Sequence, residues 1–201
     1  MADLFEEKAK EWDMNELVLN LSAAVSAAIK EQVELNDSMH VMDFGAGTGL
    51  VTTQIAGQVG KITAVDVSES MLDQLVAKEH LKLKVDAVCQ DILEIPLDTR
   101  FDLIVSAMAM HHVEDTNALV QSFADHLKPG ARIALADLDT EDGTFHPAET
   151  EGVFHHGFDR DEFKSILESK GFSDINFVTA HTVNKEGKNY PIFLVTAVMD
   201  A

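Results

Sequence analysis

The chain has 201 residues, 46% of them hydrophobic and 25% charged, and this length and composition predict one globular domain with a full-sized core. Its 35 acidic and 15 basic residues give a formal net charge of −20, which argues against nucleic acids and anionic membranes as partners. No apolar run is long enough to cross a bilayer, and the acidic first residues are not typical of a secretory signal or transit peptide, so we expect a cytoplasmic protein.

Apolar residues recur at helix-like and strand-like spacings in alternation up to residue 138. Asp13 or Asn15 is available to cap the first helix, and Ser68 to cap the third. Cys89 falls near the end of the third strand, where we expect it in the core; as the only cysteine it forms no internal disulfide. The elements predicted in this part are a helix at 15–35, a strand at 39–44, a helix at about 49–58, a strand at 61–68, a helix at 68–79, strands at 83–92 and 100–110, a helix at 115–127 that ends at the "KPG" of 128–130, and a strand at 131–138.

The pattern becomes irregular after residue 138. Residues 139–158 are polar and without a regular period, which predicts a long loop of the kind that often carries function. The elements predicted beyond this loop are a helix at 159–170 closed by Gly171 and two antiparallel strands at 175–180 and 192–200, separated by "NKEGKNY". The predicted fold class is therefore α/β: a doubly wound, seven-stranded, mostly parallel Rossmann-like sheet with a C-terminal antiparallel strand pair, in one domain over residues 1–201.

Residues 41–50 read "VMDFGAGTGL" and place three glycines at alternating positions after a strand. A glycine-rich turn between strand and helix is typical of nucleotide sites, because the backbone can approach a ligand closely. The dinucleotide fingerprint G-x-G-x-x-G/A fails, since Leu50 stands at its sixth position and Asp43 would lie near the pyrophosphate. A P-loop is excluded because no Gly-Lys-Ser/Thr follows. A nicotinamide oxidoreductase is thus disfavoured.

Acidic residues follow the first three predicted strands: Asp43, Asp66 and Asp91. Ligands of open α/β sheets bind outside the carboxyl ends of the strands, so these acids are expected at one site. An acid after the second strand suits the ribose of any nucleoside. Acids at all three ends favour a ligand with an ammonium group, a ribose and an adenine amine but no phosphate, and S-adenosylmethionine has these features and a cationic sulfonium.

Four stretches, "VMDFGAGTG", "ITAVDVSESML", "CQDI" and "FDLIVSAMAMHHV", resemble the successive motifs of class I S-adenosylmethionine-dependent methyltransferases. The tail "FHHGFDRDEFKSILESKGF" is similar to the small-molecule branch of that family, which includes methyltransferase type 11 and quinone-biosynthesis-like enzymes. The resemblance covers nearly the whole chain. It implies S-adenosyl-L-methionine as cofactor and in-line transfer of its methyl group to a small-molecule acceptor.

The resemblance also implies roles for particular positions. Each acid has an ordinary alternative, because an aspartate at the end of a strand is also a common helix N-cap, and Met71 is equally suited to the core. The implied cofactor-binding residues are Asp43, Gly45, Ala46 and Gly47 beside the methionine portion, Asp66 at the ribose hydroxyls, Val67 and Met71 beside the adenine, Asp91 at the adenine amine, Ile92 on the ring, and Ser106 and Ala107 on the sulfonium side.

Histidines cluster around the end of the fourth strand and in the long loop. A general base assists methylation of an oxygen, and histidine suits that role near neutral pH. We expect at least one of His111, His112 and His155 to contact the acceptor; His146 and His156 lie in the same loop as His155. Ordinary packing is the alternative for each ring alone. The "HH" pairs have no established metal-ligand spacing, so no metal is predicted.

The first residues of the chain carry two aromatic side chains, Phe5 and Trp12. In enzymes of this family the leading helix often closes over the cofactor, so residues 1–36 are predicted as a helical lid and residues 37–201 as the core. The two aromatic rings serve either as lid residues or as packing that holds the helix down. A non-catalytic S-adenosylmethionine-binding regulator or scaffold is the alternative function, and either a monomer or a homodimer is expected.

Overall fold

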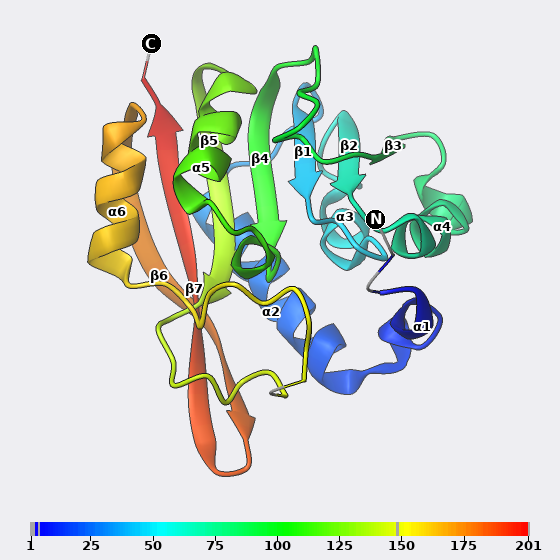
Figure 1. Cartoon of the computed structure of the whole chain (residues 1–201). Helices are drawn as coiled ribbons and strands as arrows, with labels where there is room; N and C mark the ends of the chain where they lie inside the picture. Colours follow the sequence, from blue (N-terminus) through cyan, green and yellow to red (C-terminus); the bar gives the residue numbers. More distant parts are fainter. Residues whose placement is uncertain (1–2, 4, 148, 201) are drawn as a thin grey trace.

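The computed structural model describes residues 3, 5–147 and 149–200, and it contains a seven-stranded sheet with helices on both faces (Figure 1). Across the sheet the strands follow the order β3-β2-β1-β4-β5-β7-β6. The strands are β1 (His40–Phe44), β2 (Lys61–Asp66), β3 (Val85–Cys89), β4 (Phe101–Ala107), β5 (Leu127–Leu138), β6 (Phe172–Lys185) and β7 (Lys188–Met199). The helices and 3-10 turns are α1 (Glu6–Ala9), η1 (Trp12–Met14), α2 (Glu16–Gln32), α3 (Leu50–Ile55), α4 (Glu69–Val76), η2 (Glu79–Leu81), η3 (Met110–His112), α5 (Thr116–Asp125) and α6 (Arg160–Ser169).

The predicted fold class is confirmed. Strands β1 to β5 pair in parallel, whereas β7 runs antiparallel to both β5 and β6. Because the parallel strands share one direction, their carboxyl ends meet at a single edge of the sheet, the lower edge in Figure 1. The long loop between β5 and α6 and the short helix α1 lie at this same edge (Figure 1). The fold thus gathers the predicted acids and histidines on one side of the molecule.

Alternation along the strands divides the core into two layers. One layer, against α2 and α3, contains Val41, Leu103 and Leu194. The other layer, against α5 and α6, contains Met42, which follows Val41, and Phe193, which precedes Leu194. All five side chains are fully buried. Side chains of a β-strand point alternately to opposite faces, so continuous apolar runs such as "FLV" are what a sheet covered on both faces requires.

Two of the predicted helix caps form. The Asn15 side chain accepts from the backbone N–H groups of Leu17 and Val18, and Ser68 Oγ accepts from the N–H of Met71. These bonds satisfy amide groups that have no partner inside the helix. Asp13 takes no part in capping α2, because its carboxylate contacts Thr48 instead.

The prediction that the helix at 115–127 ends at "KPG" was wrong in one respect: α5 ends at Asp125, and the chain is already in β5 at Leu127. Leu127 pairs with Phe101 of β4, and the register then shifts before Arg132 pairs with Leu103. Gly130, with φ of 75°, lies in the bulge that absorbs the extra residues. The bulge accommodates the Pro-Gly pair inside the strand, although the sequence pattern predicts a break there.

The last two strands are longer than expected, because "NKEGKNY" is mostly strand. Lys185 pairs with Lys188, so that only Glu186 and Gly187 remain in the turn. Both turn residues have positive φ, 53° and 81°, which is the geometry of a two-residue hairpin turn. The burial expected for Cys89 is also wrong: the thiol is exposed, because β3 is the edge strand of the sheet.

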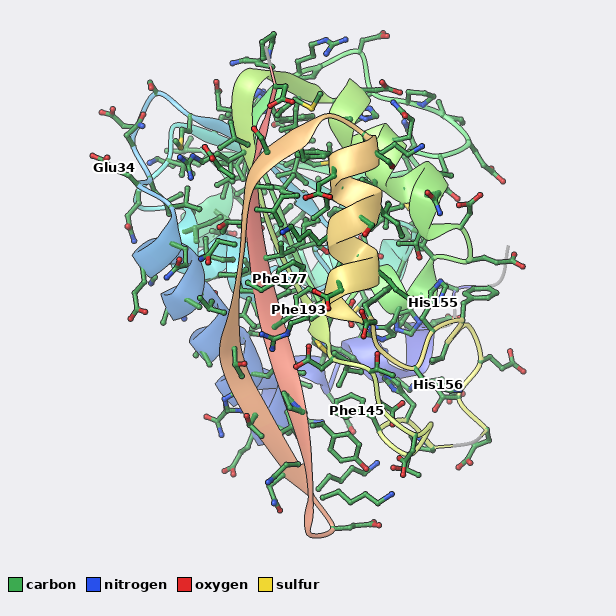
Figure 2. The ribbon with its side chains drawn as sticks, turned by 90° about the vertical axis from the view of Figure 1, so that its left-hand side faces the viewer. Glu34, Phe145, His155, His156, Phe177 and Phe193 are labelled. Atoms are coloured by element: carbon green, nitrogen blue, oxygen red, sulfur yellow. The ribbon has the colours of Figure 1, made fainter. Side chains whose placement is uncertain are left out.

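Aromatic residues concentrate between β7 and α6, on the face that Figure 2 presents. The Phe193 ring lies 5.5 Å from Phe177, 6.0 Å from Phe163 and 6.5 Å from Phe158, measured between centroids. Phe193 is fully buried, so this cluster fixes α6 and the end of the long loop against the sheet. No helix within the described ranges is long and apolar enough to span a membrane.

Replacing Phe193 with alanine is expected to lower the free energy of unfolding by about 3–5 kcal/mol, because the truncation removes apolar contacts and leaves a cavity among three other rings. Urea-induced unfolding measures the change. Phe154→Ala is the matched control: Phe154 is 52% exposed, and its loss should alter the free energy of unfolding by less than about 0.5 kcal/mol. Equal losses in the two variants would contradict the assignment of the core.

Candidate active site

The glycine turn between β1 and α3 has the left-handed backbone that glycine favours. Gly45, Gly47 and Gly49 have φ values of 66°, 54° and 78°. A Cβ atom on Gly45 would lie 2.2 Å from Cβ of Ala109, so the turn packs directly on the segment that follows β4. At Gly47 an added Cβ would meet no atom within 4 Å. The turn is therefore fixed by packing at Gly45 and open to a ligand at Gly47.

Asp66 at the end of β2 connects this turn to α4. One carboxylate oxygen accepts from the N–H of Gly47 at 2.7 Å, and the other accepts from the N–H of Ser68 at 2.9 Å. Burial raises the pKa of Asp66 above its usual value, while these hydrogen bonds oppose the rise. The cap of α4 is Ser68, so the simple N-cap interpretation of Asp66 does not describe its contacts.

Asp43 lies beneath the turn and is fully buried. Its Oδ2 accepts a 2.5 Å hydrogen bond from the hydroxyl of Thr52 on α3. Burial raises the pKa of Asp43 from 3.8 to about 7, and the nearby Asp66 carboxylate adds to the rise. Ala46 is also buried, and its N–H donates to the carbonyl oxygen of Val65. These contacts hold the first part of the turn against the ends of β1 and β2.

The residues expected around an adenine lie in different environments. Val67 is 65% exposed, whereas Met71 and Ile92 are buried. Asp91 is half-buried and accepts from the N–H of Leu93 at 2.8 Å. Ile92 packs in the core layer under α5, so its contact with a ring, like that of Met71, stays a prediction.

The end of β4 contains an unpaired hydroxyl and a strained residue. Ser106 Oγ is buried and has no hydrogen-bond partner in the described part of the chain. Ala107 follows it half-buried, and Met108 then has a φ of 58°, a conformation uncommon for a residue with a side chain. Strained backbone of this kind clusters at ligand sites. It turns the chain abruptly into η3, which carries His111 and His112.

The structure brings three of the predicted histidines together. Nδ1 of His111 lies 2.7 Å from Oδ1 of Asp137, and Nε2 of His111 lies 3.2 Å from Nε2 of His146. Both His111 and Asp137 are fully buried. Nδ1 of His112 donates to the carbonyl oxygen of Gly152 at 2.6 Å, and its ring centroid is 4.2 Å from that of His111.

His155 and His156 are separate from this cluster, although they lie on the same loop (Figure 2). Nε2 of His155 is 2.9 Å from the carbonyl oxygen of Val113 and 3.1 Å from that of Glu114, which ties the loop to the start of α5. His156 is exposed, with Nδ1 3.5 Å from Glu141. A contact between His155 and an acceptor stays a prediction, and its present contacts are structural.

A cleft of about 490 Å³ opens beside the cluster, between the N-terminal segment and the long loop. Its volume is in the range of small-molecule sites. Its walls are mainly aromatic rings and its rim carries charged residues; the lining residues are Phe5, Lys8, Trp12, His112, His146, Pro147, Glu149, Thr150 and Glu151.

The N-terminal segment is held over the site by acidic side chains. Asp3 accepts from the hydroxyl and the N–H of Ser70 at 2.7 and 3.1 Å. Asp13 accepts from Thr48 Oγ1 at 2.5 Å and pairs with Lys78 at 2.7 Å. Helix α2, by contrast, packs along the sheet against α3 and β6. The lid predicted over residues 1–36 stays a prediction, and the contacts that favour it lie before α2.

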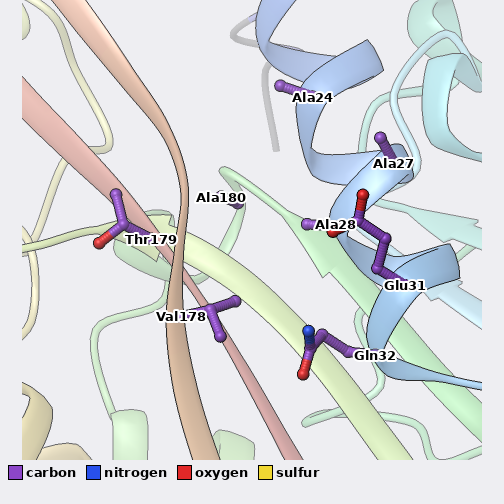
Figure 3. A pocket seen from close by; sticks show the side chains of 8 residues that line it. All are labelled: Ala24, Ala27, Ala28, Glu31, Gln32, Val178, Thr179 and Ala180. Carbon is purple, nitrogen blue, oxygen red and sulfur yellow. The ribbon is translucent and has the colours of Figure 1, made fainter.

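A second hollow, of about 370 Å³, lies between α2 and β6 (Figure 3). None of the predicted site residues lines it, and its only charged side chain is Glu31. Its lining is Ala24, Ala27, Ala28, Glu31, Gln32, Val178, Thr179 and Ala180. Within the described ranges, no group of three or more His, Cys, Asp or Glu side chains is arranged to hold a metal ion. The candidate site is therefore the edge formed by the carboxyl ends of the strands.

Sequence reasoning missed Asp137 and the two N-terminal acids, Asp3 and Asp13. Asp137 had a usable signal, because it is an acid within the apolar strand "ARIALADL", and a buried charge needs a partner. Asp3 and Asp13 had none, since they resemble the other acids of a strongly acidic surface.

Comparison with known proteins gives consistent matches. Residues 41–130 match the family described as "Methyltransferase domain". An uncharacterized methyltransferase of Schizosaccharomyces pombe is 33% identical over 135 residues, which are 59% of this chain and 48% of that protein. The ubiquinone biosynthesis O-methyltransferase of Coxiella burnetii is 34% identical over 115 residues, 55% of this chain and 48% of that protein. The chain thus spans about half the length of these curated relatives.

Solved structures share the fold over nearly the whole chain. The complex of DhpI with S-adenosylhomocysteine superposes with a TM-score of 0.78 at 19% identity, covering 98% of this chain and 95% of that one. Phosphoethanolamine N-methyltransferase 2 of Haemonchus contortus superposes with a TM-score of 0.75 at 18% identity, covering 96% of this chain and 57% of that one. These superpositions confirm the fold, and the domain match over residues 41–130 and the curated relatives agree with the resemblance that the four sequence motifs predict.

The buried Asp43 should make the stability of the ligand-free chain depend on pH. Its folded-state pKa of about 7 exceeds the unfolded value of 3.8, so the folded state binds the extra proton, and stability falls as the pH rises from about 4 to about 7. The decline attributable to Asp43 is up to about 4 kcal/mol. Urea-induced unfolding across this range should show a smaller decline in Asp43→Asn. Parallel pH curves for the two proteins would contradict the prediction.

Proposed function

We propose that this chain, whose residues 41–130 match a methyltransferase domain, is a class I S-adenosylmethionine-dependent methyltransferase acting on a small-molecule acceptor. The observation that carries the proposal is the carboxylate of Asp66, which joins the N–H of Gly47 to the start of α4 at the end of β2. An anionic group in this position suits the ribose diol of a nucleoside. The pyrophosphate of a dinucleotide is disfavoured by a different acid, Asp43, which lies beneath the glycine turn.

The residues present fit the cofactor. Space is open at Gly47, where an added Cβ would meet nothing within 4 Å. The buried hydroxyl of Ser106 has no partner among the described residues and is available to a ligand beside the turn. Asp43 lies at the end of β1 and Asp91 follows β3, and in the proposed complex these two acids and Asp66 face a cationic nucleoside.

In the proposed complex Asp66 binds the ribose hydroxyls, Asp91 the adenine amine, and Gly45, Ala46 and Gly47 line the methionine portion. Val67, Met71 and Ile92 border the adenine, while Ser106 and Ala107 border the sulfonium. The cofactor, when bound, supplies an electrophilic methyl group. The protein supplies orientation and a site that excludes water, which is the protein's usual contribution to cofactor chemistry.

The acceptor is proposed to reach the site from the side of η3. Met108 and Ala109 separate β4 from η3, so His111 and His112 follow the cofactor-lining residues directly. The Asp137 carboxylate accepts from Nδ1–H of His111, an arrangement that fixes the orientation of the ring. A buried, oriented imidazole next to the cleft favours catalysis over a purely regulatory or scaffolding role.

The proposed small-molecule acceptor agrees with the names of two similar proteins, a ubiquinone biosynthesis O-methyltransferase and a phosphoethanolamine N-methyltransferase. For this chain, methylation of a small molecule is part of the proposal. The excess of acidic residues supports an acceptor other than nucleic acid and no association with anionic membranes. A cytoplasmic location and a monomeric or homodimeric state remain predictions.

The proposal predicts that S-adenosylhomocysteine raises the thermal unfolding midpoint, increasingly with concentration, because a ligand that binds only the folded state stabilises it by about 2.7 kcal/mol at 100 times its dissociation constant. Asp66→Asn should weaken binding about ten- to hundredfold, as expected for losing hydrogen bonds to a charged group. Reduced nicotinamide cofactor should give no shift.

Asp98→Asn is the matched control, since Asp98 is an exposed loop acid away from the turn. It should bind S-adenosylhomocysteine like the unaltered chain in isothermal titration calorimetry. If saturating S-adenosylhomocysteine shifts neither the unaltered chain nor Asp98→Asn, the proposed function is wrong.

A further inference from the structure

We propose that the cleft between the N-terminal segment and the long loop binds an uncharged aromatic acceptor carrying a hydroxyl group, and that His146 takes the hydroxyl proton while it passes its own Nε2 proton to His111, which lies beside Asp137. This inference rests on the proposed methyltransferase function. It assigns the acceptor site, the class of acceptor and a catalytic residue within that site.

The shape and lining of the cleft favour a flat ring. Phe5 lies between two other rings, with its centroid 6.0 Å from Trp12 and 5.6 Å from His112, and both pairs are nearly perpendicular at 87° and 86°. His146 forms the opposite part of the lining, with its centroid 6.0 Å from that of His112. Aromatic rings arranged edge to face leave faces and edges on which another ring can pack.

The charges at the cleft disfavour an anionic acceptor. Two carboxylates, Glu149 and Glu151, stand at the rim, and both residues are exposed. The one basic side chain of the lining is Lys8, whose ammonium lies over the Phe5 ring at 5.9 Å from its centroid. The rim therefore carries more negative than positive charge, within a chain whose formal net charge is −20.

The hydrogen bonds of Asp137 define the direction of proton transfer. Its carboxylate accepts from the N–H of Leu138 at 2.8 Å and from the N–H of His111 at 3.2 Å, in addition to Nδ1 of His111. With Nδ1–H of His111 donated to Asp137, the Nε2 atom of His111 is an acceptor. The hydrogen bond at 3.2 Å then places a proton on Nε2 of His146 and leaves its Nδ1 unprotonated.

His112 is the rival base, because its Nδ1–H donates to the Gly152 carbonyl and its Nε2 is unprotonated in the neutral ring. The two rings differ in what supports the extra proton. A proton gained by His112 would be stabilised by that carbonyl and, without a direct hydrogen bond, by Asp137, but burial and the neighbouring His111 outweigh both and lower the pKa of His112. A proton gained by His146 can move to His111, which faces a fully buried carboxylate.

The environment of His146 keeps it neutral and ready to accept. Burial lowers its pKa to about 4, and the neighbouring His111 and His112 rings and Lys185 add to the lowering, while Asp137 opposes it. At neutral pH the ring is therefore uncharged, with one free nitrogen, and it is also a weak proton acceptor by itself. The relay to His111 and Asp137 provides the stabilisation that the isolated ring lacks.

In the proposed step, a lone pair of the acceptor oxygen forms the new bond to the methyl carbon. The bond between that carbon and the sulfonium sulfur breaks, and its electron pair stays on sulfur, which becomes neutral. The hydroxyl proton moves to Nδ1 of His146 as the Nε2 proton of His146 moves to Nε2 of His111. The positive charge lost from sulfur then resides on the imidazolium beside Asp137, so charge and atoms balance.

Trp12 makes acceptor binding directly observable, because it is the only tryptophan in the chain and lines the cleft. Catechol added to the chain saturated with S-adenosylhomocysteine should change the Trp12 fluorescence in a saturable way. The anionic probe 3,4-dihydroxybenzoate should bind up to about fivefold more weakly than catechol, which is the size of effect expected for exposed charges. The double variant Glu149→Gln, Glu151→Gln should reduce this difference in affinity between the two probes. Equal or tighter binding of the anionic probe would overturn the proposed acceptor class.

Catalysis is tested with two acceptors that differ in acidity: catechol, which is protonated at neutral pH, and 4-nitrocatechol, which is largely ionised. His146→Gln should lower kcat for catechol by about 10²-fold or more, as is typical for removal of a general base, and lower it far less for 4-nitrocatechol. S-adenosylhomocysteine binding should be unchanged. His112→Gln should instead affect both acceptors equally and chiefly through KM.

His156→Gln is the matched control, because His156 is an exposed histidine of the same loop that does not line the cleft. It should leave kcat and KM unchanged for both acceptors. If Asp137→Asn still binds S-adenosylhomocysteine, it should lose kcat for catechol and far less for 4-nitrocatechol, as His146→Gln does. If it does not bind S-adenosylhomocysteine, the relay is judged from His146→Gln.

Equal losses of kcat on both acceptors in His146→Gln would overturn the relay, as would an acceptor dependence seen in His112→Gln alone. Binding of S-adenosylhomocysteine without methylation of either catechol by the unaltered chain would overturn the proposed acceptor class and leave the proposed function in place. Failure to bind S-adenosylhomocysteine at all would contradict the proposed function itself.

Discussion

The candidate site depends on one carboxylate, that of Asp66. Its two oxygens hold the N–H of Gly47 and the N–H of Ser68, and so they fix the glycine turn after β1 relative to the start of α4 after β2. Among the described residues, Asp66 is the one side chain that forms hydrogen bonds with both segments. Burial disfavours a charge at Asp66, whereas the two amide hydrogen bonds favour it. The same group thus shapes the turn and provides its main polar feature.

Much of this arrangement was predictable because it follows from local chemistry. Alternating apolar runs predicted the sheet, and the requirement for positive φ explains why Gly45, Gly47 and Gly49 stand where they do. The carboxyl ends of parallel strands meet at one edge by geometry alone, so acids placed after strands were expected to converge there. What the sequence could not reveal is how deeply each side chain is buried. Cys89 is exposed because β3 is the last strand of the sheet, and strand order is a global property that no local pattern encodes.

The histidines show the same limit at the level of single side chains. His111, His112 and His155 were equivalent candidates in the sequence, but their environments differ. His111 is buried against Asp137, His112 lines the cleft, and His155 ties the loop to backbone carbonyls before α5. The difference arises from β5, which places Asp137 beneath η3 through pairing that is distant in the chain. A buried carboxylate requires a hydrogen-bond partner, and it therefore selects one ring of the "HH" pair.

The N-terminal segment connects the two halves of the site. Asp13 binds Thr48 of the glycine turn and Lys78 after α4, while Asp3 binds the first turn of α4, so acids on one short segment contact both elements that Asp66 joins. The same segment carries Phe5 and Trp12, which form a wall of the cleft. Any movement of residues 5–14 therefore alters the turn and the cleft together, since their contacts lie on one continuous stretch of chain. Most of these contacts are partly exposed hydrogen bonds and ion pairs rather than packed core, and such contacts are individually weak. The lid predicted from the sequence stays a prediction, and these are the contacts that its opening would have to break.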